Sequence, residues 1–90
     1  MAARAYVKWF NQAGYDSMSE KDLISFEITF CDANIAGGYE VAYGEVQFTP
    51  GDPASQLRGA ITTVIQAEAG ARGFSVAKQD MCIPAVQQGV

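Results

Sequence analysis

The feature that most constrains the fold is the ten-residue stretch Asp22–Cys31 (DLISFEITFC), in which apolar and polar residues alternate. Four large apolar side chains occupy every second position: Ile24, Phe26, Ile28 and Phe30. Successive side chains of a β-strand point to opposite faces, so this period of two predicts a strand with one buried face. The other segments must therefore supply strands to pair with it and a layer to cover that face.

The segments that follow predict a hairpin. Asp32–Gly38 (DANIAGG) holds the Asp, Asn and paired Gly residues of a turn, and Tyr39–Thr49 (YEVAYGEVQFT) returns as a further strand. Pairing Cys31 with Tyr39 across the turn would set the register. Large residues then lie opposite small ones, with Ile24 facing Val46, Phe26 facing Gly44 and Ile28 facing Ala42. This arrangement leaves room for a helix across the same face.

A helix and two outer strands complete the expected fold. Arg4–Phe10 (RAYVKWF) is short and rich in aromatic and β-branched residues, which favours a first strand. Apolar residues at helical spacing follow the breaker at Asp52 and Pro53: Leu57, Ile61, Val64 and Ile65. They predict a helix over Pro53–Arg72 that Gly73 stops. Phe74–Val86 reads as a last extended segment, which Pro84 restricts to a sheet edge or a bulge.

Residues 1–90 are therefore expected to form a single domain of the α+β class. The expected architecture is a small, mainly antiparallel sheet of about four strands with one helix packed on one face, in the order β-β-β-α-β.

The chain contains no histidine, and this removes the residue on which many catalytic and metal sites depend. Serine–histidine nucleophiles and histidine-ligated metals are excluded. Cys31 and Cys82 lie far apart without a CxxC partner, so a zinc site would need carboxylates for its other ligands. We expect two reduced, partly buried thiols, with a disulfide between two strands as the alternative.

The carboxylates do not assemble a recognisable acid–base pair. Asp16, Glu20 and Asp22 cluster in or next to a polar loop, as a solvated face would. Glu68 falls at the edge of the helix's buried stripe, where it is either a candidate acid or the partner of Arg72, four residues on. We expect no enzyme, no catalytic residue, no cofactor and no metal. A concave pocket enclosing two carboxylates would revive the enzyme hypothesis.

The charge of the chain indicates which classes of partner it can bind. The formal net charge is −4, and the six basic residues are scattered along the chain, so no basic footprint for phosphates is present. Met1–Phe10 interleaves basic with apolar residues and does not read as a signal peptide or a membrane span. We therefore expect neither nucleic acid nor a membrane as a partner.

The hairpin register predicts a surface for another protein chain. It places Tyr39, Val41 and Tyr43 on the face opposite the helix, and Tyr6, which shares a face of the first strand with Arg4, Lys8 and Phe10, is added to them as a candidate. One helix covers only one face of a sheet, so these four residues are the candidate interface. The alternative is that the tyrosines are ordinary strand formers at a wet surface. A second candidate is the row of small residues on the helix: Ala60, Thr63, Ala67 and Gly70 or Ala71.

The whole build suggests a class of protein. An opening strand (YVKWFN), a hairpin with an alternating first arm (LISFEITF) and a helix running through QLRGAITTVIQAEAGARGF into a final strand resemble small structural proteins of tailed bacteriophage particles. The resemblance implies a viral protein present in many copies on the virion, such as a capsid decoration (cement) protein, or else a tail or connector component. It carries over no individual residue.

The leading hypothesis is a non-enzymatic structural protein that forms homo-oligomers and bridges subunits of a larger assembly, with itself and other structural proteins as partners. Its location would be the virion, or the cytoplasm if the resemblance fails. The rival is a monomeric protein-binding or regulatory module that uses the first loop, Asn11–Lys21, and an open sheet edge.

Overall fold

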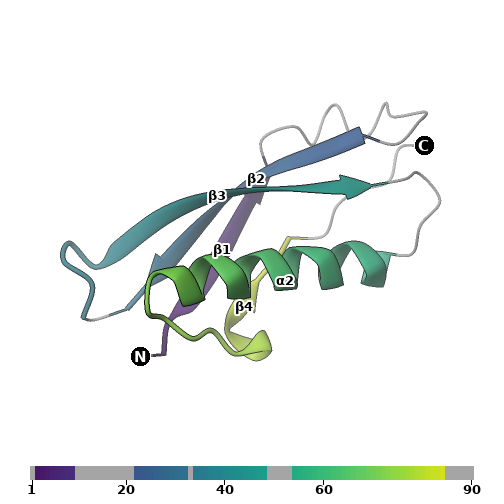
Figure 1. The fold of residues 1–90 in the computed structure, drawn as a ribbon. Helices are drawn as coiled ribbons and strands as arrows, with labels where there is room; N and C mark the ends of the chain where they lie inside the picture. Colours follow the sequence, from purple (N-terminus) through teal and green to yellow (C-terminus); the bar gives the residue numbers. More distant parts are fainter. Residues whose placement is uncertain (1, 10–21, 33, 49–53, 85–90) are drawn as a thin grey trace.

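The computed structural model describes residues 2–9, 22–32, 34–48 and 54–84. Its elements in chain order are β1 (Arg4–Trp9), β2 (Asp22–Cys31), β3 (Tyr39–Phe48), α2 (Ala54–Ala71), the short 3-10 helix η1 (Lys78–Asp80) and β4 (Met81–Cys82) (Figure 1). The expected first loop, the helix opening at Asp52 and Pro53, and the acidic residues Asp16 and Glu20 lie outside the described residues.

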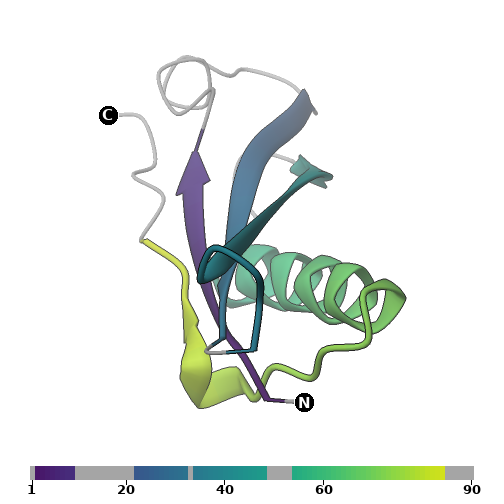
Figure 2. The ribbon, with the colours of Figure 1, turned by 90° about the vertical axis from the view of Figure 1, so that its left-hand side faces the viewer.

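The four strands form one sheet in the order β3-β2-β1-β4. β1 and β3 each pair antiparallel with β2, and β4 adds parallel to the outer side of β1. The helix α2 lies along one face of this sheet (Figures 1 and 2). The predicted α+β fold, with its mainly antiparallel sheet and its β-β-β-α-β order, is confirmed. The strand order, which the sequence left open, makes β3 and β4 the two edges.

The hairpin has the predicted register. Cys31 pairs with Tyr39, and the core positions pair as expected: Ile24 with Val46, Phe26 with Gly44, and Ile28 with Ala42. All four large residues of the alternating stretch are fully buried. The alternation of apolar and polar residues in this stretch therefore predicted the buried face correctly.

The helix covers that face with the apolar stripe that its spacing predicted. Leu57, Ile61 and Ile65 are buried, while Val64 is only partly buried and packs at the margin of the core. The helix ends in a Schellman motif: Gly73 has a φ of 79°, Phe74 N donates to Ala69 O at 2.8 Å, and Gly73 N donates to Gly70 O at 3.1 Å. The left-handed backbone at this position explains why the stop is a glycine.

The segment after the helix is less regular than the sequence predicts. Of the expected extended stretch Phe74–Val86, only Met81–Cys82 is a strand within the described part, and η1 precedes it. Two side chains hold the residues that follow: Arg58 Nη1 donates to Ile83 O at 3.0 Å, and Trp9 Nε1 donates to Pro84 O at 3.2 Å. In a longer strand these carbonyls would be available to pair with a neighbouring strand, but here they accept hydrogen bonds from side chains. β4 is a sheet edge, as Pro84 predicted.

Candidate functional site

The face of the sheet opposite α2, which we call the open face, carries the four candidate residues. Tyr6 is 43% exposed, Tyr39 60% and Tyr43 63%, and these three are the exposed large hydrophobic residues of the described part of the chain. Val41 is half-buried beside them. The structure thus places Tyr39, Val41 and Tyr43 on the predicted side of the sheet, and the pairing of Tyr6 with Thr29 puts Tyr6 on the same side.

The register arranges the open face in rows across the strands. One row runs from Cys82 through Tyr6 and Thr29 to Val41, and the next runs from Lys8 through Glu27 to Tyr43. Within the second row the basic Lys8 and the acidic Glu27 are direct cross-strand neighbours. Thr29 Oγ1 also donates to Glu27 Oε1, at 3.5 Å. The centre of the face therefore combines aromatic and β-branched groups with charges that offset each other.

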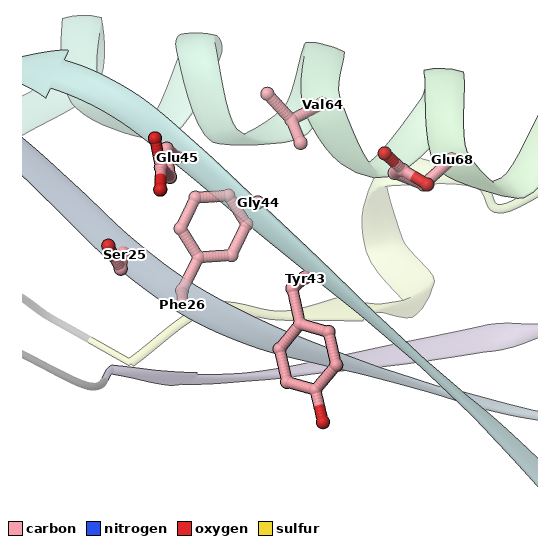
Figure 3. Close-up of a pocket in the computed structure, with 7 residues that line it drawn as sticks. All are labelled: Ser25, Phe26, Tyr43, Gly44, Glu45, Val64 and Glu68. Carbon is pink, nitrogen blue, oxygen red and sulfur yellow. The ribbon is translucent and has the colours of Figure 1, made fainter.

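A hollow lies where β3 passes α2, and we call it the Gly44 hollow. Its volume is about 510 Å³, and it is lined by Ser25, Phe26, Tyr43, Gly44, Glu45, Val64 and Glu68. Figure 3 shows Val64 and Glu68 on the helix, and the ring of Tyr43 pointing away from the helix. Gly44 fits here because an added Cβ would lie 2.7 Å from Phe26 Cζ and 2.8 Å from Val64 Cγ1. The missing side chain lets strand and helix approach closely.

Arg72, which directly follows α2, forms an ion pair with Glu68, one of the residues that line this hollow. Arg72 Nη1 donates to Glu68 Oε2 at 2.7 Å and to the Glu68 carbonyl at 3.0 Å. Arg72 Nε lies 3.3 Å from Glu40 Oε1 of β3, which is ion-pair distance without the geometry of a hydrogen bond. The guanidinium carbon is 6.0 Å from the centre of the Phe30 ring. Of the two readings of Glu68, the structure shows the ion pair with Arg72.

Two acidic residues, Glu45 and Glu68, line the hollow. The register places Glu45 on the open face with Tyr43, whereas Glu68 lies on the helix that covers the other face. Carboxylate catalysis needs one group to act as acid and the other as base in different environments. Glu68 is instead held by a charged hydrogen bond to Arg72, and Glu45 is exposed. Among the described residues no group of three acidic or thiol side chains is placed to hold a metal ion. The two carboxylates therefore do not form one acid–base pair.

Both cysteines are free thiols; Cys31 is half-buried and Cys82 is exposed. Strand β1 separates them, since Cys31 pairs with Arg4 and Cys82 with Tyr6. Two neighbouring strand spacings of about 4.8 Å exceed the Cα separation that a disulfide spans. This geometry agrees with the expected reduced thiols, but Cys82 is exposed and not partly buried as the sequence suggested.

Replacing Arg72 with methionine should lower the free energy of unfolding by about 1–2 kcal/mol, because it leaves Glu40 and Glu68 as neighbouring acids without their base. The side chain is 26% exposed, so water screens part of the interaction. Urea unfolding followed by circular dichroism measures the change. Lys78→Met, which removes an exposed base of η1, is the control and should change the value by less than about 0.5 kcal/mol. Equal effects of the two substitutions would contradict the role given to Arg72.

Within the described part of the chain, no helix is both long enough and apolar enough to cross a membrane. No protein-family model, curated protein or solved structure matches the chain.

Proposed function

We propose that this is a non-enzymatic structural protein that associates with copies of itself through the open face and bridges subunits of a larger assembly. Within that class, the build of the chain supports a capsid decoration protein of a tailed phage, and a tail or connector component is the alternative. The virion would then be its location, with other structural proteins as further partners.

The observation that carries the proposal is the exposure of Tyr6, Tyr39 and Tyr43 on a face that the helix does not cover. Tyrosines supply large contact areas with little rotamer entropy to lose, and they are enriched at protein interfaces. Val41, half-buried beside them, continues the β-branched and aromatic surface. Packing a second sheet against this face would bury the exposed rings.

The charges of the open face support a protein partner over a nucleic acid. Lys8 is a cross-strand neighbour of Glu27, so one of the basic residues on this face already has an acidic neighbour. The chain as a whole carries a formal net charge of −4. A phosphate backbone needs an uncompensated basic stripe, whereas a protein surface of mixed charge suits this face.

Changing Tyr43 or Tyr6 to glutamate should shift the protein from oligomer to monomer, because each change places a charge in the centre of the proposed contact. Light scattering on a size-exclusion column measures the mass over a range of concentrations. We expect at least a tenfold rise in the concentration at which half the chains associate, corresponding to about 1.4 kcal/mol. The melting temperature of the monomer should stay unchanged.

Gln66→Glu is the matched control, since it adds the same charge at an exposed position of α2, away from the open face. It should associate like the parent protein. A parent protein that stays monomeric and joins no larger particle would reject self-association. Loss of folding in Tyr43→Glu would place Tyr43 in the core instead of at an interface.

The rival hypothesis, a monomeric binding module, predicts a 1:1 complex with a different protein and no change of mass when the chain is alone. The same light-scattering series separates the two hypotheses.

A further inference from the structure

We propose that two copies of the chain pack through their open faces with their strands running in the same direction, so that the basic strand β1 of each copy lies across from the acidic half of the other. This inference rests on the proposed self-association. It adds the orientation of the two copies and the charged residues that select this orientation.

The charges of the open face are separated by strand. Arg4 and Lys8 lie on β1, Glu27 lies on β2 and Glu45 lies on β3, and the register puts all four on the side of the exposed tyrosines. Among the strand residues that the structure describes on this face, these four are the charged ones. One half of the face is therefore basic and the other half is acidic.

Two of these charges are available to a partner. Lys8 and Glu45 are exposed, and neither lies within ion-pair distance of an opposite charge in the described part of the chain. Arg4 is also exposed, but it lines a small hollow together with the acidic Asp80. Lys8 and Glu45 are therefore the charges that a second copy can best engage.

Two face-to-face arrangements keep the strands of two identical sheets aligned. When the two-fold axis runs parallel to the strands, the strands of both copies run in the same direction and the strand order is reversed, so β1 lies across from the acidic half of the other copy. When the axis crosses the strands at right angles, β1 lies across from β1 and β3 from β3. The first arrangement joins opposite charges and the second joins like charges. Like charges across an interface are destabilising, so the charge separation selects the first.

The exposed tyrosines fit the same arrangement. Tyr43 lies in the same cross-strand row as Lys8, and Tyr39 lies in the same row as Arg4. A two-fold axis parallel to the strands keeps each row at the same height along the strands, so the bases of one copy approach the tyrosine rings of the other. A cation over an aromatic ring is attracted to it. The charges and the rings therefore support one orientation.

Charge reversal tests this orientation. Lys8→Glu and Glu45→Lys should each raise the concentration at which half the chains associate by at least about tenfold, because each puts like charges in contact. Light scattering on a size-exclusion column measures this concentration. An equimolar mixture of the two variants should associate like the parent protein, because every contact then joins opposite charges again. The variant that carries both substitutions should do so alone.

Two comparisons separate a local contact from an effect of net charge. Glu45→Lys adds two positive charges to a chain whose formal net charge is −4, so net repulsion alone would predict stronger association, whereas the proposed contact predicts weaker association. Gln66→Lys, at an exposed position of α2, is the control and should associate like the parent. Lys8 and Glu45 are exposed, so each variant should keep the circular dichroism spectrum of the parent.

Stronger association of Lys8→Glu would show that β1 lies across from β1, and it would overturn the proposed orientation. Unchanged association of both charge variants, together with loss of association in Tyr43→Glu, would overturn the orientation while leaving self-association through the open face intact. Failure of the mixture and of the double variant to recover association would overturn it as well. A parent protein that stays monomeric would reject the proposed function and this orientation together.

Discussion

Replacing Phe26 with alanine is expected to lower the free energy of unfolding by about 3–5 kcal/mol, the largest effect of any substitution considered for this chain. Phe26 is fully buried in the middle of β2. Its ring packs edge-on against Trp9, with centroids 5.9 Å apart and an interplanar angle of 72°, and it fills the space that Gly44 leaves open. Because small domains have a total stability of about 5 kcal/mol or slightly more, most of the stability should be lost.

Urea unfolding monitored by circular dichroism measures this loss. The matched control is Gln47→Ala, an exposed position of the neighbouring strand, which should change the stability by less than about 0.5 kcal/mol. A loss below about 1 kcal/mol in Phe26→Ala would mean that the ring does not fill the core as described.

Replacing Gly44 with alanine is expected to destabilise the protein by about 1–3 kcal/mol, although alanine is ordinarily acceptable in a strand. The new Cβ would meet Phe26 Cζ at 2.7 Å, Val64 Cγ1 at 2.8 Å and Phe26 Cε2 at 2.9 Å. These atoms belong to packed side chains at the sheet–helix contact, so relieving the overlap must shift a ring of the core.

Two further variants make this prediction specific. Gly59→Ala, on α2, meets no atom within 4 Å and should stabilise the protein by about 0.5–1 kcal/mol, the opposite sign for the same chemical change. Phe26→Leu removes the ring atoms that the new methyl group would strike, so adding Gly44→Ala to Phe26→Leu should cost less than adding it to the parent. Strictly additive effects would show that the clash is not the cause.

The hairpin and the helix were predictable because their signals are local. The alternation from Ile24 to Phe30 gave the buried face, and the pairing of large with small residues gave the register that the structure has. Gly73 marked the end of the helix because only a residue that tolerates a positive φ closes the final turn there.

The last strand was harder to predict because distant contacts decide it. The Trp9 hydrogen bond to Pro84 joins residues 75 positions apart, and no local pattern in either segment signals it. The parallel pairing of β4 with β1 depends on the same long-range arrangement. Sequence patterns therefore located Pro84 at an edge without showing which strand it would flank.

One part of the candidate site was also predictable from the sequence, and another part was not. The side of the sheet on which Tyr39, Val41 and Tyr43 lie followed from the register. The Gly44 hollow did not, because it depends on how closely β3 packs against α2, where Gly44 lies next to Val64. One signal was present in the sequence: a glycine inside a strand opposite a phenylalanine marks a place where another element comes close.

The two edges of the sheet differ in length, and this difference limits the kind of polymer that the molecule can form through its strands. Growth of a cross-β fibre requires each subunit to offer two competent edges, one for the preceding subunit and one for the next. Among the strands that the structure describes, only β3 offers a long edge, while β4 is two residues long and its flanking carbonyls at Ile83 and Pro84 are bonded to side chains. The described sheet therefore has one edge long enough to accept a strand, so addition at that edge closes a complex instead of extending a fibre.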